Sequence, residues 1–314
     1  MYSFFQTAHE ELKAGRRVFA CFVAANRKGS PGTPAARMLI FESGKQVGTI
    51  GGGIMEKSII DQAIERLSNS VSMPPCLDDL VHRKTEGASA SGLICGGAQS
   101  NVSFILEPNT ATCALLERIT AACDVEGYLE VTAHGLLYSE LNLDCANRLD
   151  TSDGGWIYQL NLVNQRRIAI FGGGHCGCAL AEQMSRLGYA VTIIEPRNDV
   201  VTLEDLPGEV LLIHADYSEA VEGLKWSDRT HAVVMTHSMQ TDVDALNAAL
   251  GLPFASIGVM GSSPKIARIR TSLLDLSWSD LQISGVRAPI GLSFDSDTPE
   301  EIAVSIAAQI LLER

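Results

Sequence analysis

Two runs of three glycines are the residues of this sequence best suited to hold a charged ligand. Gly51-Gly52-Gly53 follows the apolar run 47–50, and Gly172-Gly173-Gly174 follows the apolar run 167–171. A strand that ends on glycines and leads into a helix presents free backbone N–H groups at the positive end of the helix dipole, which suits phosphate or pyrophosphate. The two runs therefore predict one ligand with phosphate groups, or two ligands.

The second glycine run extends into the pattern G-x-G-x-x-G, with Gly172, Gly174 and Gly177 at the glycine positions. In dinucleotide-binding folds the first glycine makes a tight turn, the second lets a pyrophosphate approach, and the third lets the helix pack closely on the strand. Glu195 ends the next expected strand, about 20 residues further on, where an acidic side chain reads a ribose hydroxyl. The pattern predicts a nucleotide-type ligand, and a Rossmann-like fold without a dinucleotide is the alternative.

Two cysteines and a histidine could add chemistry near glycine turns. Cys176 follows His175 at the start of the helix after the second glycine run, where the helix dipole is expected to lower a thiol pKa. Cys95 precedes Gly96-Gly97 and could touch a ligand or a metal ion, although a core cysteine before a turn gives the same pattern.

A second histidine and a pair of basic residues follow later strands. Thr236-His237 follows the apolar run 231–235, at the carboxyl end of an expected strand, where open α/β sheets bind ligands. A hydrogen-bonded loop residue is the alternative for His237, and a metal site with Asp242 and Asp244 is a weaker one. Lys265 and Arg268 share a helix face and could bind an anion or face solvent.

Composition limits the class of protein. A chain of 314 residues is long enough for about two domains with sizeable cores. The net charge of −13 excludes general binding to nucleic acid or anionic membranes. No apolar run approaches the roughly 18 residues of a membrane span, and no signal peptide is recognisable. The eight cysteines include no C-x-x-C pair, so we expect reduced thiols and a cytoplasmic protein.

The predicted architecture is α/β with three parts. An N-terminal α+β domain is expected over 1–107, a poorly specified connecting region over 108–164, and a Rossmann-like domain over 165–314. In the last part, apolar strands are expected at 167–171, 190–194, 210–214, 231–235 and 254–259. Because helix-like segments separate most of these strands, we expect a parallel sheet with helices on both faces.

Taken together, these motifs resemble the xanthine dehydrogenase accessory proteins of the XdhC/CoxI family. The resemblance runs in order over nearly the whole chain, with 108–164 the least covered. The matching segments are Gly29-Ser30-Pro31, Ala36-Arg37-Met38, Gly48-Thr49-Ile50-Gly51-Gly52-Gly53 with Glu56, Cys95-Gly96-Gly97, Phe171-Gly172-Gly173-Gly174-His175, Glu195-Pro196-Arg197, Thr236-His237, Gly258-Val259-Met260-Gly261-Ser262, Pro289-Ile290-Gly291-Leu292 and Thr298-Pro299-Glu300-Glu301-Ile302-Ala303-Val304-Ser305-Ile306.

The resemblance implies an accessory factor without turnover of its own. Such proteins bind the molybdenum cofactor, as molybdopterin or its dinucleotide, while a sulfurtransferase or cysteine desulfurase adds the terminal sulfido ligand. They then deliver it to a xanthine dehydrogenase-type apo-enzyme. The resemblance places Cys95 near the molybdenum, as a possible metal contact. The other residues it assigns to cofactor binding are Gly51, Gly52, Gly53, Gly172, Gly174, His175, Gly177, Glu195 and His237.

The sequence departs from the family pattern at two places, and two alternative functions fit the same residues. Ser263-Pro264 stand where family members often have a more basic stretch, and no second histidine lies near Met239. One alternative function is an NAD(P)-dependent oxidoreductase with His237 as acid or base. The other is a nucleotide-sensing regulatory protein. A homodimer is expected only because homodimers are the commonest oligomers.

Overall fold

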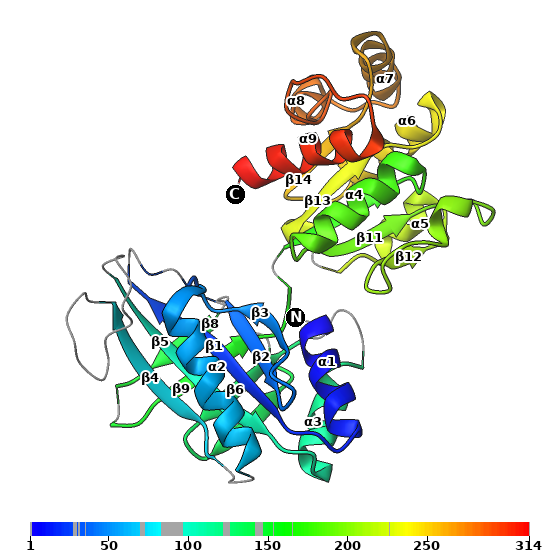
Figure 1. Ribbon diagram of the computed structural model, residues 1–314. Helices are drawn as coiled ribbons and strands as arrows, with labels where there is room; N and C mark the ends of the chain where they lie inside the picture. Colours follow the sequence, from blue (N-terminus) through cyan, green and yellow to red (C-terminus); the bar gives the residue numbers. More distant parts are fainter. Residues whose placement is uncertain are drawn as a thin grey trace. The chain divides into compact units, whose positions relative to one another are not determined.

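The computed structural model describes residues 2–27, 30, 32–34, 36–69, 73–82, 97–121, 126–141, 147–152, 154–164, 166–225 and 227–313. The chain divides into two compact units, Met1–Val163 and Asn164–Arg314, called unit 1 and unit 2 here (Figure 1). Each unit has its own buried hydrophobic clusters. In the part of the chain that the structure describes, no helix is both long and apolar enough to cross a membrane.

The first sheet of unit 1 has five antiparallel strands in the order β3-β2-β1-β5-β4. The central strand β1 is buried along most of its length, which explains its continuous apolar sequence. Helix α2 covers one face of this sheet through Met55, Ala63 and Leu67. The bounds are β1 Val18–Asn26, β2 Arg37–Phe41, β3 Gln46–Thr49, α2 Gly53–Ser68, β4 Cys76–His82 and β5 Gly97–Leu106.

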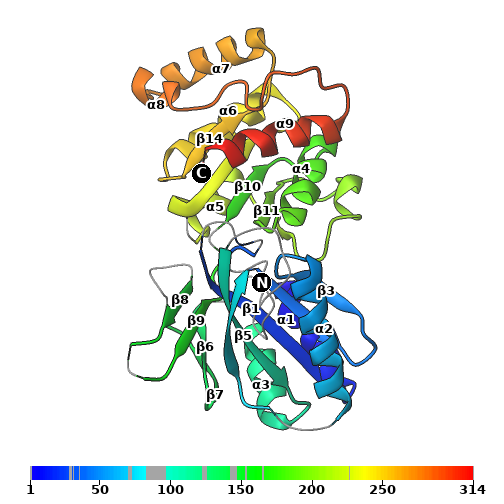
Figure 2. The same cartoon turned by 60° about the vertical axis from the view of Figure 1, so that its left-hand side comes forward.

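A second antiparallel sheet, in the order β7-β6-β9-β8, completes unit 1 on the side away from α2 (Figure 2). Its Tyr158 ring lies 6.3 Å from Phe22 of the first sheet, in one buried cluster with helices α1 and α3. The region 108–164 was expected to be a connection, but its described residues up to 163 belong to unit 1 and contribute to its core. The bounds are α1 Tyr2–Lys13, α3 Thr110–Ile119, β6 Tyr128–Thr132, β7 Gly135–Ser139, β8 Asn147–Asp150 and β9 Ile157–Asn161.

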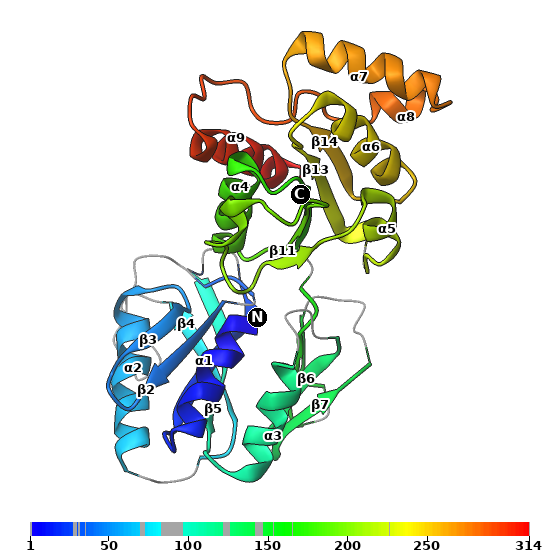
Figure 3. The ribbon, with the colours of Figure 1, turned by 90° about the vertical axis from the view of Figure 1, so that its right-hand side faces the viewer.

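Unit 2 is a five-stranded parallel sheet in the order β12-β11-β10-β13-β14. Helices α4 and α9 lie side by side on one face, and α5 and α6 cover the other (Figure 3). The predicted Rossmann-like arrangement is confirmed. The bounds are β10 Arg167–Phe171, α4 His175–Arg186, β11 Ala190–Ile194, β12 Leu211–Ile213, α5 Tyr217–Glu222, β13 Thr230–Val234, α6 Met239–Leu250, β14 Ser256–Val259, α7 Ser263–Asp275, α8 Asp280–Ser284 and α9 Pro299–Leu312.

Two local features stabilise the edge strand β14 and the start of helix α9. Arg287 pairs with the edge strand β14, since its N–H donates to Ile257 O and its carbonyl accepts from Val259 N, both at 2.9 Å. Helix α9 begins with a capping box, in which the Thr298 hydroxyl accepts from the N–H of Glu301 at 3.2 Å. Pro299 then takes the first helical position, where a missing N–H costs nothing.

Candidate functional site

The chain direction changes at the carboxyl ends of β10 and β13, which are neighbours in the sheet of unit 2. After β10 the chain runs to one edge of the sheet, and after β13 it runs to the other. In open α/β sheets this switch point forms the ligand crevice. The two strand ends are joined directly, because Met235 N donates to Phe171 O at 3.0 Å. The structure therefore brings Gly172–Gly174 and Thr236-His237 to the same edge.

The three glycines of the G-x-G-x-x-G pattern have different surroundings. Gly172 has a φ of +119°, a conformation that favours glycine. A Cβ on Gly177 would lie 2.0 Å from Gly172 O, so this glycine permits the contact between α4 and β10. Among the described residues, a Cβ on Gly174 would meet nothing within 4 Å, and no side chain caps the start of α4 there. The start of α4 at Gly174 is therefore open and lacks a side-chain cap among the described residues.

Glu195 lies where predicted, after β11, but its carboxylate is already occupied. It is 1% exposed and accepts from Gly173 N at 2.8 Å and from Arg197 N, Nε and Nη2 at 3.1, 2.9 and 2.9 Å. Burial raises the pKa of Glu195, but the hydrogen bonds from Arg197 and Gly173 outweigh it and hold that pKa below its usual range. A ribose hydroxyl would have to displace one of these donors, since both oxygens accept twice.

The side chains at the start of α4 are neutral or exposed. His175 is exposed, at the first position of the helix. Burial raises the pKa of the Cys176 thiol, and the Glu300 carboxylate raises it further, so the expected lowering by the helix dipole is wrong. The Cys178 thiol donates to Gly173 O at 3.3 Å and its pKa is also raised by burial. Cys178 therefore links the start of α4 to the glycine turn.

A buried ion pair beside Thr236, the residue before His237, was not predicted from the sequence. Asp242 is fully buried, and its Oδ1 accepts from Thr236 N at 2.9 Å and Thr236 Oγ1 at 2.7 Å. Its Oδ2 pairs with the ammonium of Lys265. Lys265 therefore neutralises an internal carboxylate. It is not available for the anion site that the sequence suggested for Lys265 and Arg268.

His237 itself is exposed, and its side chain makes no hydrogen bond within the described residues. Asp242 is committed to Thr236 and Lys265, and it does not join His237 and Asp244 as metal ligands. No group of three His, Cys, Asp or Glu side chains in the described ranges could hold a metal ion. Cys95, predicted as a molybdenum contact, lies outside those ranges.

The first glycine run, in unit 1, also holds a carboxylate of its own chain. Gly51, Gly52 and Gly53 all have positive φ, at 127°, 75° and 74°. Oε2 of Glu56 accepts from Ile50 N at 2.9 Å and Gly52 N at 3.0 Å. Glu56 Oε2 also accepts from Thr49 Oγ1 at 2.5 Å, and Oε1 accepts from Gln46 Nε2 at 3.3 Å. Each glycine turn thus has one N–H satisfied by an internal acid, Glu56 in one and Glu195 in the other.

Replacing Glu56 by glutamine is expected to lower the free energy of unfolding of unit 1 by about 2 kcal/mol at pH 7, because charged hydrogen bonds are lost. Burial raises the pKa of Glu56, but the bonds from Thr49, Ile50, Gly52 and Gln46 bring it below the usual value. Because the pKa of Glu56 is lower in the folded protein than in the unfolded chain, this stabilisation is present above the pKa of the unfolded chain. It disappears as the pH falls through the pKa of the folded protein.

Urea unfolding between pH 7 and pH 3 checks this prediction. The difference between the parent and Glu56→Gln should shrink as the solution becomes acidic. Glu65→Gln, an exposed acid on the same helix, serves as the control and should leave the pH profile unchanged. A difference between parent and Glu56→Gln that stays constant over this pH range would contradict the assigned role.

Two protein-family models match this chain. The XdhC Rossmann domain matches residues 168–310, from β10 through α9, and the model of the XdhC and CoxI family matches residues 11–73, in unit 1. The chain belongs to the XdhC and CoxI family. The resemblance stated from the glycine and cysteine motifs is therefore confirmed.

Individual relatives of this XdhC-family chain are distant. The uncharacterized protein YqeB of Escherichia coli K12 is 24% identical over 93% of this chain and 43% of its own length. A Bacillus subtilis 168 protein described as a probable xanthine dehydrogenase subunit is 28% identical over 47% of this chain and 43% of its own length. This chain thus spans less than half the length of the curated relatives it matches.

A solved structure shares the fold of this XdhC-family chain. The crystal structure described as a xanthine dehydrogenase from Bacillus halodurans superimposes with a TM-score of 0.70 at 20% identity. The superposition covers 98% of this chain and 95% of that one. At this identity the likeness supports the fold, including both the antiparallel sheets and the parallel sheet, and nothing about the chemistry.

Proposed function

We propose that this protein binds the molybdenum cofactor and assists its sulfuration and its insertion into a xanthine dehydrogenase-type molybdenum hydroxylase. Membership of the XdhC and CoxI family supports a role in xanthine dehydrogenase maturation. The observation that carries the cofactor-binding part is the open space at Gly174, beside the uncapped start of α4.

The residues at this edge fit a phosphate or pyrophosphate group. The first N–H groups of a helix lack partners within the helix, and those of α4 begin at Gly174 and His175. Glu195, the nearest acid, is neutralised by Arg197 at 2.9 Å, so the local field does not repel an anion as the net charge suggests. His237 lies at the end of the adjacent strand β13 and could donate to the same group.

In this proposal the protein holds the cofactor and catalyses nothing. The cofactor supplies the molybdenum centre that the client enzyme uses, and a sulfurtransferase or cysteine desulfurase supplies the sulfido ligand. The phosphate end is proposed to bind at Gly174, in the turn that Gly172 and Gly177 shape, and Cys95 is proposed to contact the molybdenum. Gly51, Gly52 and Gly53 are proposed to contribute in unit 1.

The direct test is to purify the protein from cells that make the cofactor and to identify any released pterin by mass. Recovery of molybdopterin or its dinucleotide in a stoichiometric amount would support the proposal. Recovery of NAD(H) alone would overturn the proposal and would favour an oxidoreductase. An assay of NAD(P)H oxidation with a panel of carbonyl compounds would then test for that activity.

Gly174→Val is expected to reduce cofactor retention at least about tenfold, because its branched side chain fills the space beside the helix N–H groups and removes about one charged hydrogen bond. The Tm should change little, since the position is open. Gly208→Val is the matched control, because that glycine also has nothing within 4 Å among the described residues and lies between α4 and β12 in sequence, away from this edge. Equal retention by the two variants would exclude the start of α4 as the binding site.

A further inference from the structure

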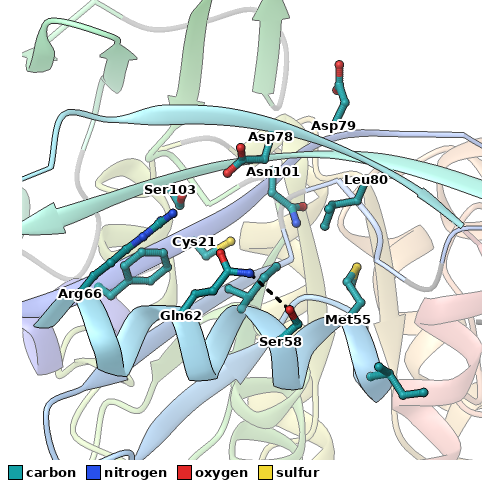
Figure 4. Close-up of a pocket in the computed structure, with 13 residues that line it drawn as sticks. Cys21, Met55, Ser58, Gln62, Arg66, Asp78, Asp79, Leu80, Asn101 and Ser103 are labelled. Atoms are coloured by element: carbon teal, nitrogen blue, oxygen red, sulfur yellow. Dashed lines mark hydrogen bonds between the residues drawn. The ribbon is translucent and has the colours of Figure 1, made fainter. Parts of the chain in front are cut away.

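Unit 1 contains a slot between helix α2 and the adjacent face of the sheet (Figure 4). Its volume is about 380 Å³, at the small end of the range for sites that hold organic molecules. Apolar side chains form much of the two long walls, namely Phe19 and Leu80 from the sheet and Ile54, Met55 and Ile59 from the helix. The slot is therefore a candidate site for a small organic molecule.

Strand β5 carries polar residues on the buried face below this slot. Gln99, Asn101 and Ser103 alternate along the strand and are only 2%, 2% and 4% exposed. Side chains that alternate along a strand share one face of the sheet. Packing alone would favour apolar residues there, because a buried polar group costs free energy unless it is hydrogen-bonded. The strip therefore requires partners for all its polar atoms.

One polar atom of this strip has no partner among the described residues. Asn101 Oδ1 accepts from Gln99 Nε2 at 3.0 Å, and Gln99 Nε2 also donates to Ile50 O at 3.3 Å. Gln99 Oε1 accepts from Ser30 Oγ at 2.7 Å, so both amides are fixed in orientation. Asn101 lines the slot, and its Nδ2 is left as a buried donor that no acceptor in the described ranges reaches.

The helix wall offers the complementary acceptor. Gln62 Nε2 donates to Ser58 Oγ at 3.3 Å, which turns Oε1 of Gln62 toward the sheet (Figure 4). No donor from the described part of the chain reaches that oxygen. A buried donor on the sheet and an acceptor on the helix match a group that has C=O next to N–H, as in a cyclic lactam.

Charges at the slot argue against an anionic ligand. Arg66 is the basic residue in the lining, whereas Asp78 and Asp79 are both acidic. The Asp79 carboxylate accepts from Ser100 and points away from the slot (Figure 4). A phosphate bound here would be attracted by Arg66 but repelled by at least the Asp78 carboxylate. A purely apolar ligand would leave the Asn101 amide without an acceptor.

We infer that this slot binds a flat, uncharged ring compound that carries a lactam group. The lactam oxygen accepts from Asn101 Nδ2, the lactam N–H donates to Gln62 Oε1, and the ring lies between Leu80 and Met55. Oxo-purines and oxo-pyrimidines are common compounds of this class. The inference stands on unit 1 alone and does not depend on the function proposed for the crevice of unit 2.

The test is a titration of the full chain with 2-quinolinone, a bicyclic lactam, and with quinoline, the same ring system without the carbonyl. Ligand-observed NMR is expected to give a Kd of roughly 0.1–1 mM for 2-quinolinone, from the usual affinity per atom of a small ligand. Quinoline should bind at least about tenfold more weakly, because it cannot accept from Asn101. No saturable binding of 2-quinolinone, or equal binding of quinoline, would overturn the inference.

Two variants place the binding in the slot. Ser58→Trp fills the space from the exposed surface of α2 and should abolish binding, whereas Lys57→Trp, one residue earlier and outside the lining, should not. Asn101→Leu should weaken binding at least about tenfold while the Tm stays the same or rises, since it removes a buried donor that no described residue satisfies. A marked fall in Tm would mean that Asn101 is a structural residue. Unchanged affinity in Ser58→Trp would mean that the compound binds elsewhere.

Discussion

Gly177→Ala is expected to lower the free energy of unfolding of unit 2 by about 3 kcal/mol or more. The added Cβ would lie 2.0 Å from the carbonyl oxygen of Gly172 and 3.1 Å from its carbonyl carbon. Both are backbone atoms of a turn that already holds a positive φ, so neither can move aside cheaply. Helix α4 would have to separate from β10, in the centre of the sheet.

Denaturant unfolding, followed by circular dichroism, measures this loss. Gly174→Ala provides the control three residues earlier, because no described atom lies within 4 Å of its added Cβ and its φ is −73°. That variant should stay within about 1 kcal/mol of the parent, the usual range for a change at a helix N-cap. If Gly177→Ala is as stable as Gly174→Ala, the close packing of α4 on the glycine turn does not hold.

Lys265→Met is expected to destabilise unit 2 by about 3 kcal/mol, because it leaves the carboxylate of Asp242 buried without its counter-charge. Methionine keeps most of the aliphatic stem, so the loss reports on the charge. Since Asp242 also fixes Thr236 at the end of β13, the effect reaches the edge where the ligand is proposed to bind.

Two further variants separate charge from packing. Arg268→Met, exposed on the same helix, should change stability by no more than about 0.5 kcal/mol. Adding Asp242→Asn to Lys265→Met should restore part of the loss, because the neutral amide oxygen can still accept from Thr236. The role of the ion pair is refuted if Lys265→Met and Arg268→Met unfold at the same denaturant concentration.

The parallel sheet was the part of the fold most accessible from sequence. The strands predicted at 167–171 and 190–194 are the observed β10 and β11. Strands buried on both faces read as continuous apolar runs, and the glycine turn marks where the first one ends. Strands β7 and β8 of the second sheet in unit 1 gave no such signal, because they have 5 and 4 residues and lie half in solvent.

The parts of the candidate site that are formed by the backbone could be predicted from the sequence. The roles of Gly172 and Gly177 follow from the spacing of the glycines, and the structure places both as expected. The partners of Glu56, Glu195 and Asp242 were not predictable, because side-chain hydrogen bonds to a turn depend on the tertiary path of the chain. The alternation of Gln99, Asn101 and Ser103 was visible in the sequence, and it indicates a polar face once the strand is known to be buried.

The pairing of Arg287 with β14 has a consequence for how this protein behaves at high concentration. The unpaired N–H and C=O groups of a sheet edge can recruit a strand from another molecule and start aggregation. Here one edge strand of the parallel sheet is covered by Arg287, and the other, β12, has only 3 residues. The sheet of unit 2 therefore offers little template for intermolecular strand addition.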